Sequence, residues 1–298
     1  MGTEAMDAID AVAVRVSFGR GVIGLTGACH GRVTLAGLVG ERAAAGWQPV
    51  TEGESGAEVF RAPGGAEYAK CVPREHVEAL EQERDRVAWG SGHGVPGPRV
   101  LDWTADETGA CLLTSAVAGV PADKVDEDEL TEAWPSIAEA IRTLHEMPAG
   151  DCPFGRELSA MLALADDVVG RGAVNPDFLR PEQRNVAPER LLASLRAEEP
   201  ERAAQEAAGT VVCHGDLCLP NIVLDQETMR FTGFVDLGRL GRADRHADLA
   251  LVLANARETW HDEERARRAD ELFEKHYGLP LDAGRLAFYL TLDPLTWG

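Results

Sequence analysis

Apolar positions between residues 57 and 115 follow a strand period, interrupted by one stretch with a helix period. Strands are expected at 57–62, 66–72, 99–103 and 110–115. The first two are joined by the turn Pro63-Gly64-Gly65, which predicts a hairpin. Between the pairs, apolar residues recur at steps of three and four over 77–88 and predict a helix. This part of the chain is therefore a small sheet with one helix.

The rest of the chain is mainly helical in its pattern. Two amphipathic stripes run over 130–144 and 158–169, and further helices are expected at 243–258, 263–276 and 284–290. Short β runs are expected at 211–213, 222–224 and 231–235. A small β-rich portion before a larger helical portion predicts an α+β fold of two lobes.

The expected lobes are an N-lobe over 47–117 and a C-lobe over 118–298, with a crossover at 118–121. Residues 1–46 are rich in Gly, Ala and Val and carry no clean period. They are interpreted either as a disordered extension or as translation from an upstream start codon, with no role assigned.

Composition narrows the classes of partner. The chain has 298 residues, 29 Lys and Arg against 50 Asp and Glu, and a formal net charge of −21. Such a charge disfavours nucleic acid, whose phosphates would be repelled, and favours a cationic small molecule. The six cysteines are scattered, and no stretch resembles a signal peptide or a membrane span, so we expect reduced thiols in a cytoplasmic protein.

The strongest chemical signal is an Asp five residues before an Asn, with a second Asp about one hairpin later. These are Asp216, Asn221 and Asp236. The spacing matches the catalytic loop of protein kinases, with Asp-Leu-Gly in place of Asp-Phe-Gly. Phosphoryl transfer from a magnesium nucleotide needs a carboxylate that receives the hydroxyl proton, and an Asn and an Asp that hold the metal. Asp216 is therefore the candidate base, and Asn221 and Asp236 are the candidate Mg²⁺ ligands.

Residues that bind the phosphates of the nucleotide are expected in the N-lobe. Lys70 stands near the end of the second strand, where an inward Lys would bind nucleotide phosphates if a helix carboxylate held it. Glu83 has the best helical phase for that carboxylate, ahead of Glu78 and Glu81. Ser55, in a loop that also contains Gly53 and Gly56, could add a hydroxyl to the phosphates. In contrast, His145, His246 and His261 have no clear catalytic partner and are interpreted as packing or surface residues.

Several segments carry a family resemblance. Residues 212–221 and 236–248 resemble the signature segments of aminoglycoside phosphotransferases, and the likeness runs from Trp47 to Gly298. Segments outside the catalytic core are closest to the streptomycin 3''-phosphotransferases of that family; they are 53–56, 133–136, 173–179 and 286–298.

The resemblance implies a kinase-like fold and transfer of the ATP γ-phosphate to the 3''-hydroxyl of streptomycin, which inactivates the antibiotic. It makes Asp216 the base and Asn221 and Asp236 the Mg²⁺ ligands. The other residues that it implies bind ATP; they are Lys70 with Glu83, Ser55, the Ser115 carbonyl and the Val117 amide.

Streptomycin carries two guanidinium groups, which carboxylates bind through paired hydrogen bonds. The candidate carboxylates are Asp151, Asp177, Glu258, Asp262 and Asp293, with Asp293 as the first choice. Three other functions stay open: a kinase of the same fold for another aminoglycoside or small alcohol, a protein that only sequesters the drug, and a metal-dependent hydrolase. The choice between ATP and GTP and the oligomeric state also stay open.

Overall fold

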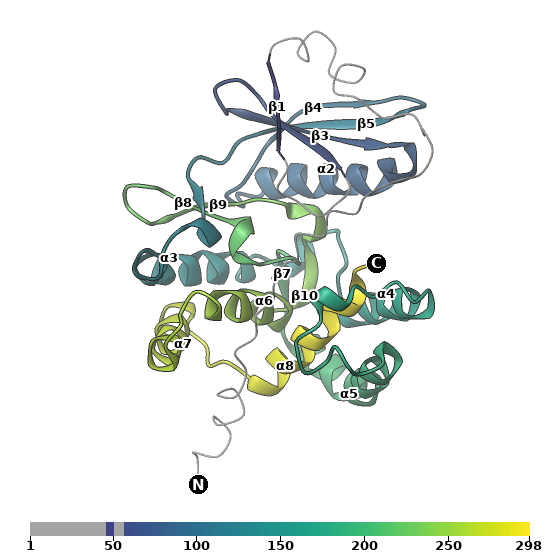
Figure 1. Ribbon diagram of the computed structural model, residues 1–298, viewed down its shortest axis with the longest axis vertical. Helices are drawn as coiled ribbons and strands as arrows, with labels where there is room; N and C mark the ends of the chain where they lie inside the picture. The colour runs from purple at the N-terminus through teal and green to yellow at the C-terminus, as the bar shows by residue number, and fades with distance from the viewer. Residues whose placement is uncertain (1–45, 51–56) are drawn as a thin grey trace. The chain divides into compact units, whose positions relative to one another are not determined.

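The computed structural model describes residues 46–50 and 57–298 of the chain. They fall into two compact units (Figure 1). The larger unit holds Val120–Phe231 and Leu240–Gly298, and the smaller holds the described residues up to Gly119 together with Thr232–Arg239. The lobe boundary drawn from the sequence at 117/118 did not anticipate that Thr232–Arg239 belongs with the smaller unit.

The smaller unit is built on one antiparallel sheet of the order β1-β2-β3-β5-β4. Its strands are β1 (Gln48–Val50), β2 (Glu58–Arg61), β3 (Glu67–Pro73), β4 (Val100–Ala105) and β5 (Gly109–Ser115). One helix, α2 (Val77–Gly92), follows β3 after the 3-10 turn η2 (Arg74–His76). The four strands and the helix expected from the pattern are therefore present.

Strand β3 presents two different faces because its side chains alternate. Val72 packs with Leu80 of α2 and with Leu112 of β5. Ala69 and Cys71 belong to a separate apolar cluster on the other side. Lys70 shares the face of Val72, which directs its side chain toward α2.

The larger unit is mainly helical. Its helices are α3 (Glu127–His145), α4 (Leu158–Gly170), α5 (Pro188–Gly209), α6 (His246–Arg257), α7 (Glu263–Tyr277) and α8 (Ala283–Leu292). Helix α3 begins with a capping box, in which Asp126 accepts from the Glu129 N–H and Glu129 accepts from the Asp126 N–H. One apolar core joins residues of α4, α5, α6 and α8 with β7 (Thr210–Cys213) and β10 (Gly241–Asp244).

Short strands and 3-10 turns carry the functional loops. Strand β7 pairs antiparallel with β10, with Cys213 opposite Gly241, and β6 (Val120–Pro121) pairs with β8 (Ile222–Leu224). Strand β9 (Phe231–Phe234) runs from the larger unit into the smaller. The 3-10 turns are η3 (Ala122–Lys124), η4 (Ala149–Asp151), η5 (Pro176–Phe178), η6 (Leu219–Asn221), η7 (Leu237–Arg239) and η8 (Asp293–Thr296).

Several elements differ from the pattern-based expectation, and strands β1 and β6 were not expected. Helix α5 was not predicted, because its C-terminal half contains Pro200 and buries the charged Arg202 and Glu206 instead of apolar residues. The helix expected over 243–258 is wrong at its start, because Ala243 and Asp244 pair with β7 and the helix begins only at His246. Among the described residues, no helix has the length and apolar character needed to cross a bilayer.

Candidate active site

The loop after β7 carries Asp216. The strand ends at Cys213, and Gly215 follows with φ of 86°. A left-handed backbone of this kind is readily adopted by Gly and disfavoured for residues with a Cβ. The Gly therefore lets the chain turn directly before Asp216.

Asp216 and Asn221 lie in direct contact. The Asn221 side-chain N–H₂ donates to the Asp216 carbonyl over 2.8 Å and to Asp216 Oδ2 over 3.3 Å. The Cys218 N–H also donates to the Asp216 carbonyl, over 3.0 Å. Since the amide nitrogen of Asn221 is engaged by Asp216, its side-chain oxygen is the atom that it can offer to a cation.

Two residues of α6 hold this loop from behind. Asp248 accepts the His214 N–H over 2.7 Å and the Gly215 N–H over 2.8 Å. Asn255 accepts the Leu219 N–H over 2.8 Å. Asp248 is fully buried. Burial alone would raise the pKa of its carboxyl, but the hydrogen bonds from His145 and from the Gly215 N–H outweigh burial and hold the pKa below its usual value.

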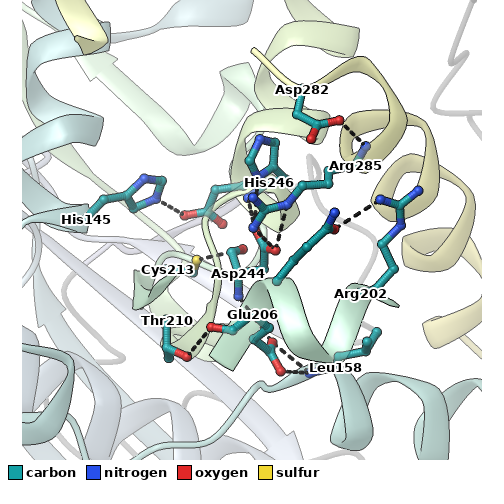
Figure 2. Close-up of polar contacts among 12 residues, drawn as sticks. His145, Leu158, Arg202, Glu206, Thr210, Cys213, Asp244, His246, Asp282 and Arg285 are labelled. Carbon is teal, nitrogen blue, oxygen red and sulfur yellow. Dashed lines mark hydrogen bonds and ion pairs between the residues drawn. The ribbon is translucent and has the colours of Figure 1, made fainter. Parts of the chain in front are cut away.

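A second buried carboxylate cluster fixes the start of α6 (Figure 2). Asp244 accepts from the backbone N–H and from Nδ1 of His246, each over 2.8 Å, and is paired with Arg285 of α8. Glu206 accepts the backbone N–H groups of Leu158 and Asp244. Burial opposes ionisation of Asp244, yet its bonds to His246 and Arg285 keep its pKa below the usual value. This cluster ties α5, β10, α6 and α8 together.

The smaller unit gathers Lys70, Glu83 and Asp236. Lys70 Nζ lies 2.7 Å from Glu83 Oε2 and 3.9 Å from Asp236 Oδ1. Burial would lower the pKa of the Lys70 ammonium, but the charges of Asp236 and Glu83 outweigh burial and raise that pKa above its usual value. Burial and the charge of Asp236 together raise the pKa of the Glu83 carboxyl, against the opposing effect of Lys70. The Lys70–Glu83 contact expected from helical phase is thus present.

Asp236 has an unusual backbone. Its φ is 56°, which places a residue with a Cβ in the left-handed region at a cost of about 1–3 kcal/mol. Such positions cluster at functional sites. Near it, a Cβ on Gly238 would lie in van der Waals contact, 3.5 Å from Glu83 and 3.6 Å from Asp236 Oδ1. This backbone conformation places the half-exposed Asp236 carboxylate beside Lys70.

The other nucleotide residues expected from the resemblance are placed unevenly. Ser115 ends β5, where its hydroxyl accepts the Arg99 N–H over 3.0 Å. Val117 lies just beyond, with its side chain so near Gly233 that a Cβ there would come within 2.9 Å. Ser55 falls in 51–56, outside the described residues.

Two of the candidate carboxylates for the substrate, those of Asp293 and Asp262, make contacts within the chain. Asp293 is nearly buried, with Oδ1 3.4 Å from Arg156 Nη2 and Oδ2 accepting from Trp297 Nε1 over 3.1 Å. Asp262 caps α7 by accepting the Arg265 N–H. Glu258 is half-buried at the C-terminal end of α6. The remaining two lie in η4 and η5; they are Asp151 and Asp177.

Sequence reasoning missed the residues that act through the backbone. Asp248, Asn255 and Glu206 carry no spacing signal, because each accepts N–H groups from residues at least 33 positions away in the chain. A sequence signal exists for Asp248 alone of these three: it is a charged residue among the mostly apolar buried positions of α6.

These two sets define a class of protein. A carboxylate beside an Asn on one loop, and a Lys–Glu pair beside an Asp on a strained turn, are the groups by which a kinase-like enzyme transfers a phosphoryl group to a hydroxyl. Residues 46–288 match the phosphotransferase enzyme family, APH, and the chain belongs to that family.

Relatives with assigned activities are similar over most of the chain. The streptomycin 3''-kinase of Streptomyces griseus is 64% identical, covering 85% of this chain and 93% of its own. An aminoglycoside 3'-phosphotransferase of Streptomyces fradiae is 42% identical, covering 83% of this chain and 94% of its own.

Solved structures agree. Aminoglycoside phosphotransferase APH(3'')-Id from Streptomyces rimosus has a TM-score of 0.82 at 60% identity, covering 85% of this chain and 94% of its own. The same enzyme in complex with ADP and streptomycin has a TM-score of 0.81 at 58% identity, with the same coverage. The predicted kinase-like α+β fold and the predicted family are confirmed.

Proposed function

We propose that this chain transfers the γ-phosphoryl group of ATP to the 3''-hydroxyl of streptomycin and so inactivates the antibiotic. One observation carries the proposal most directly: the Streptomyces rimosus enzyme was solved with ADP and streptomycin, and this chain is 58% identical to it over 94% of its length. The Asp216–Asn221 loop and the Lys70–Glu83–Asp236 set supply the chemistry that such a reaction needs.

Asp216 is the catalytic base of this proposal. Its carboxylate accepts the proton of the 3''-hydroxyl as the hydroxyl oxygen bonds to the γ-phosphorus, while the bond from that phosphorus to the β-phosphate oxygen breaks and ADP leaves. The hydrogen bond from Asn221 to Asp216 Oδ2 orients the carboxylate. Lys70, held by Glu83, binds phosphate oxygens.

Mg²⁺ fits the residues present. The Asn221 side-chain oxygen and the half-exposed Asp236 carboxylate are hard oxygen donors, which this cation prefers. When bound, the ion neutralises the charge of the phosphates. Adenine binding by the Ser115 carbonyl and the Val117 amide, and phosphate binding by Ser55, belong to the same proposal.

The acceptor is proposed to be held by carboxylates. Guanidinium groups pair with them in a bidentate manner, and the net charge of −21 favours a cationic ligand. The candidates for this role stay Asp293, Glu258, Asp262, Asp151 and Asp177. Asp293 is also bonded to Arg156 and Trp297, and Asp262 caps a helix.

A substrate panel tests this function. Initial rates of ADP release are measured with Mg·ATP and streptomycin, with an aminoglycoside that lacks guanidinium groups, and with choline. The proposal expects the highest kcat/KM for streptomycin. Equal or greater kcat/KM for either of the other acceptors would overturn the choice of substrate, and ADP release that does not depend on any acceptor would overturn transfer itself.

The second candidate is a kinase of the same fold acting on another aminoglycoside. The 42% identity to the Streptomyces fradiae 3'-phosphotransferase favours it over choline or a metabolite. The same panel with GTP in place of ATP tests the nucleotide.

We also propose a cytoplasmic location. Five cysteines of the described residues are free thiols, as is usual in a reducing compartment.

A further inference from the structure

A buried chain of side chains stands behind the loop that carries Asp216. The Tyr277 hydroxyl lies 2.8 Å from His145 Nδ1, and His145 Nε2 lies 3.2 Å from Asp248 Oδ2. Asp248 in turn accepts the backbone N–H groups of His214 and Gly215. Tyr277, His145 and Asp248 are 2%, 6% and 0% exposed, so water cannot replace any of these bonds without a change in structure. His145 appears with its bond to a carboxylate in Figure 2.

Asp248 has little freedom in this arrangement. Both of its oxygens accept a backbone N–H, and those two N–H groups belong to the residues directly before Asp216. The Asp216 N–H lies 3.2 Å from His214 Nδ1, so the same turn also fixes the backbone of Asp216. A rotation of the Asp248 carboxylate would therefore displace the base.

His145 is placed to prevent that rotation. It ends α3 and donates from Nε2 to Oδ2, while Tyr277, at the end of α7, holds its other ring nitrogen. Two helices thus fix one imidazole, and the imidazole fixes one carboxylate.

A metal site is the alternative use of these groups. His145, Cys213 and Asp248 present ligand atoms within 4.8 Å of one another. Burial and the charge of Asp248 raise the pKa of the Cys213 thiol well above its usual value, so the thiol stays protonated. Both Asp248 oxygens already accept N–H groups. The cluster is better suited to hydrogen bonding than to holding a cation.

We propose that His145, held by Tyr277, is a positioning residue for phosphoryl transfer: it orients Asp248, which sets the backbone of His214 and Gly215 and thereby the carboxylate of Asp216. This rests on the proposed role of Asp216 as base. Because the hydrogen bonds of Tyr277, His145 and Asp248 end on the backbone of His214 and Gly215, they act on kcat and leave KM nearly unchanged.

The test compares three variants with the wild type. His145→Leu removes the donor at similar volume, His145→Gln keeps an N–H donor at about the distance of Nε2, and Tyr277→Phe removes only the hydroxyl. A pocket of about 270 Å³, lined by His145, Tyr277 and Arg245 among others, lies beside the position of the new Gln side chain. His276→Leu is the matched control, because His276 lies beside Tyr277 and bonds Glu139 instead of Asp248.

The expected results are specific. His145→Leu lowers kcat about 10- to 100-fold, the range for losing a bond to a buried charge, with KM for ATP and for the acceptor within about twofold. His145→Gln restores most of kcat, Tyr277→Phe lowers kcat by a smaller factor, and His276→Leu matches the wild type.

Two outcomes overturn the proposal. One is an unchanged kcat in His145→Leu, or in Tyr277→Phe if the Leu variant does not fold. The other is a loss of kcat in His145→Gln as large as in His145→Leu. A retained N–H donor would then make no difference, and His145 would have only a structural role. Kinetics use whichever acceptor the wild type phosphorylates, and an Asp216→Ala variant that stays active would refute the base role separately.

Discussion

Replacing Glu83 with Gln tests the nucleotide side of the site. The substitution keeps the shape of the side chain and removes its charge, so Lys70 loses its partner at 2.7 Å. The Lys70 and Glu83 side chains are only 20% and 16% exposed, so solvent screens the pair weakly. A hydrogen bond to a charged group contributes about 1.5–3 kcal/mol, which corresponds to a factor of about 10–150.

The loss is not expected to reach the top of that range. Asp236 Oδ1 lies 3.9 Å from Lys70 Nζ and can attract the ammonium when Glu83 is neutral. Lys70 would then move toward Asp236 and away from phosphate oxygens. We therefore expect kcat/KM for ATP to fall by about 10- to 50-fold, while KM for the acceptor stays the same.

The pH dependence of ATP binding should also change at its alkaline end. The pKa of Lys70 lies above its usual value because the charges of Asp236 and Glu83 outweigh burial. The stabilisation from its charged form is complete below the unfolded-state pKa and is lost as pH rises through the folded-state pKa. Removing the Glu83 charge lowers the folded-state pKa, so ATP binding in the variant should weaken at a lower pH than in the wild type.

The assay is the initial rate of ADP release against ATP concentration, repeated over an alkaline pH series. Glu81→Gln is the control, because Glu81 is on the same helix, half-exposed, and paired with Arg84 instead of Lys70. Wild-type ATP kinetics in Glu83→Gln would refute the reasoning, as would an equal loss in Glu81→Gln.

Four further predictions follow from the same contacts. Asp216→Asn should lower kcat by about 10²–10⁴ with substrate binding kept, as measured by calorimetry with Mg·ADP and streptomycin; full turnover would remove the base role. Asp236→Asn should raise the Mg²⁺ concentration for half-maximal rate without new backbone strain, since Asn tolerates φ near 56°, and an unchanged Mg²⁺ titration would argue against metal binding there. Asp248, whose pKa is held low, stabilises the fold above its unfolded-state pKa and loses this effect as pH falls through the folded-state pKa, so Asp248→Asn should flatten the thermal stability profile below about pH 5; parallel profiles would contradict this. A thiol reagent should label Cys218 before the buried Cys213 in the folded protein, as peptide mapping would show, and equal labelling would speak against the packing of β7.

The sequence could predict contacts that depend on local periods. Glu83 was chosen over Glu78 and Glu81 by helical phase, and the structure has it on Lys70. The five-residue step from Asp216 to Asn221 likewise spans one turn and η6, so their contact follows from local geometry.

Contacts between distant segments could not be predicted. Asp293 looked available for a substrate because Arg156, its partner, lies 137 positions earlier. His145 looked like a packing residue because Tyr277 and Asp248 are 132 and 103 positions away. The pattern of apolar and polar residues predicts which face of a helix or strand a residue occupies. Tertiary packing decides which side chains from distant segments come into contact there.

The most direct test of the central claim is to locate the phosphate on the product. Purified protein is incubated with streptomycin and Mg·ATP, and the product is analysed by mass spectrometry and by phosphorus–proton correlation NMR. The account predicts one added phosphoryl group, at the 3''-oxygen, and none with Asp216→Ala. Unmodified streptomycin, or a phosphate at any other hydroxyl, would contradict it.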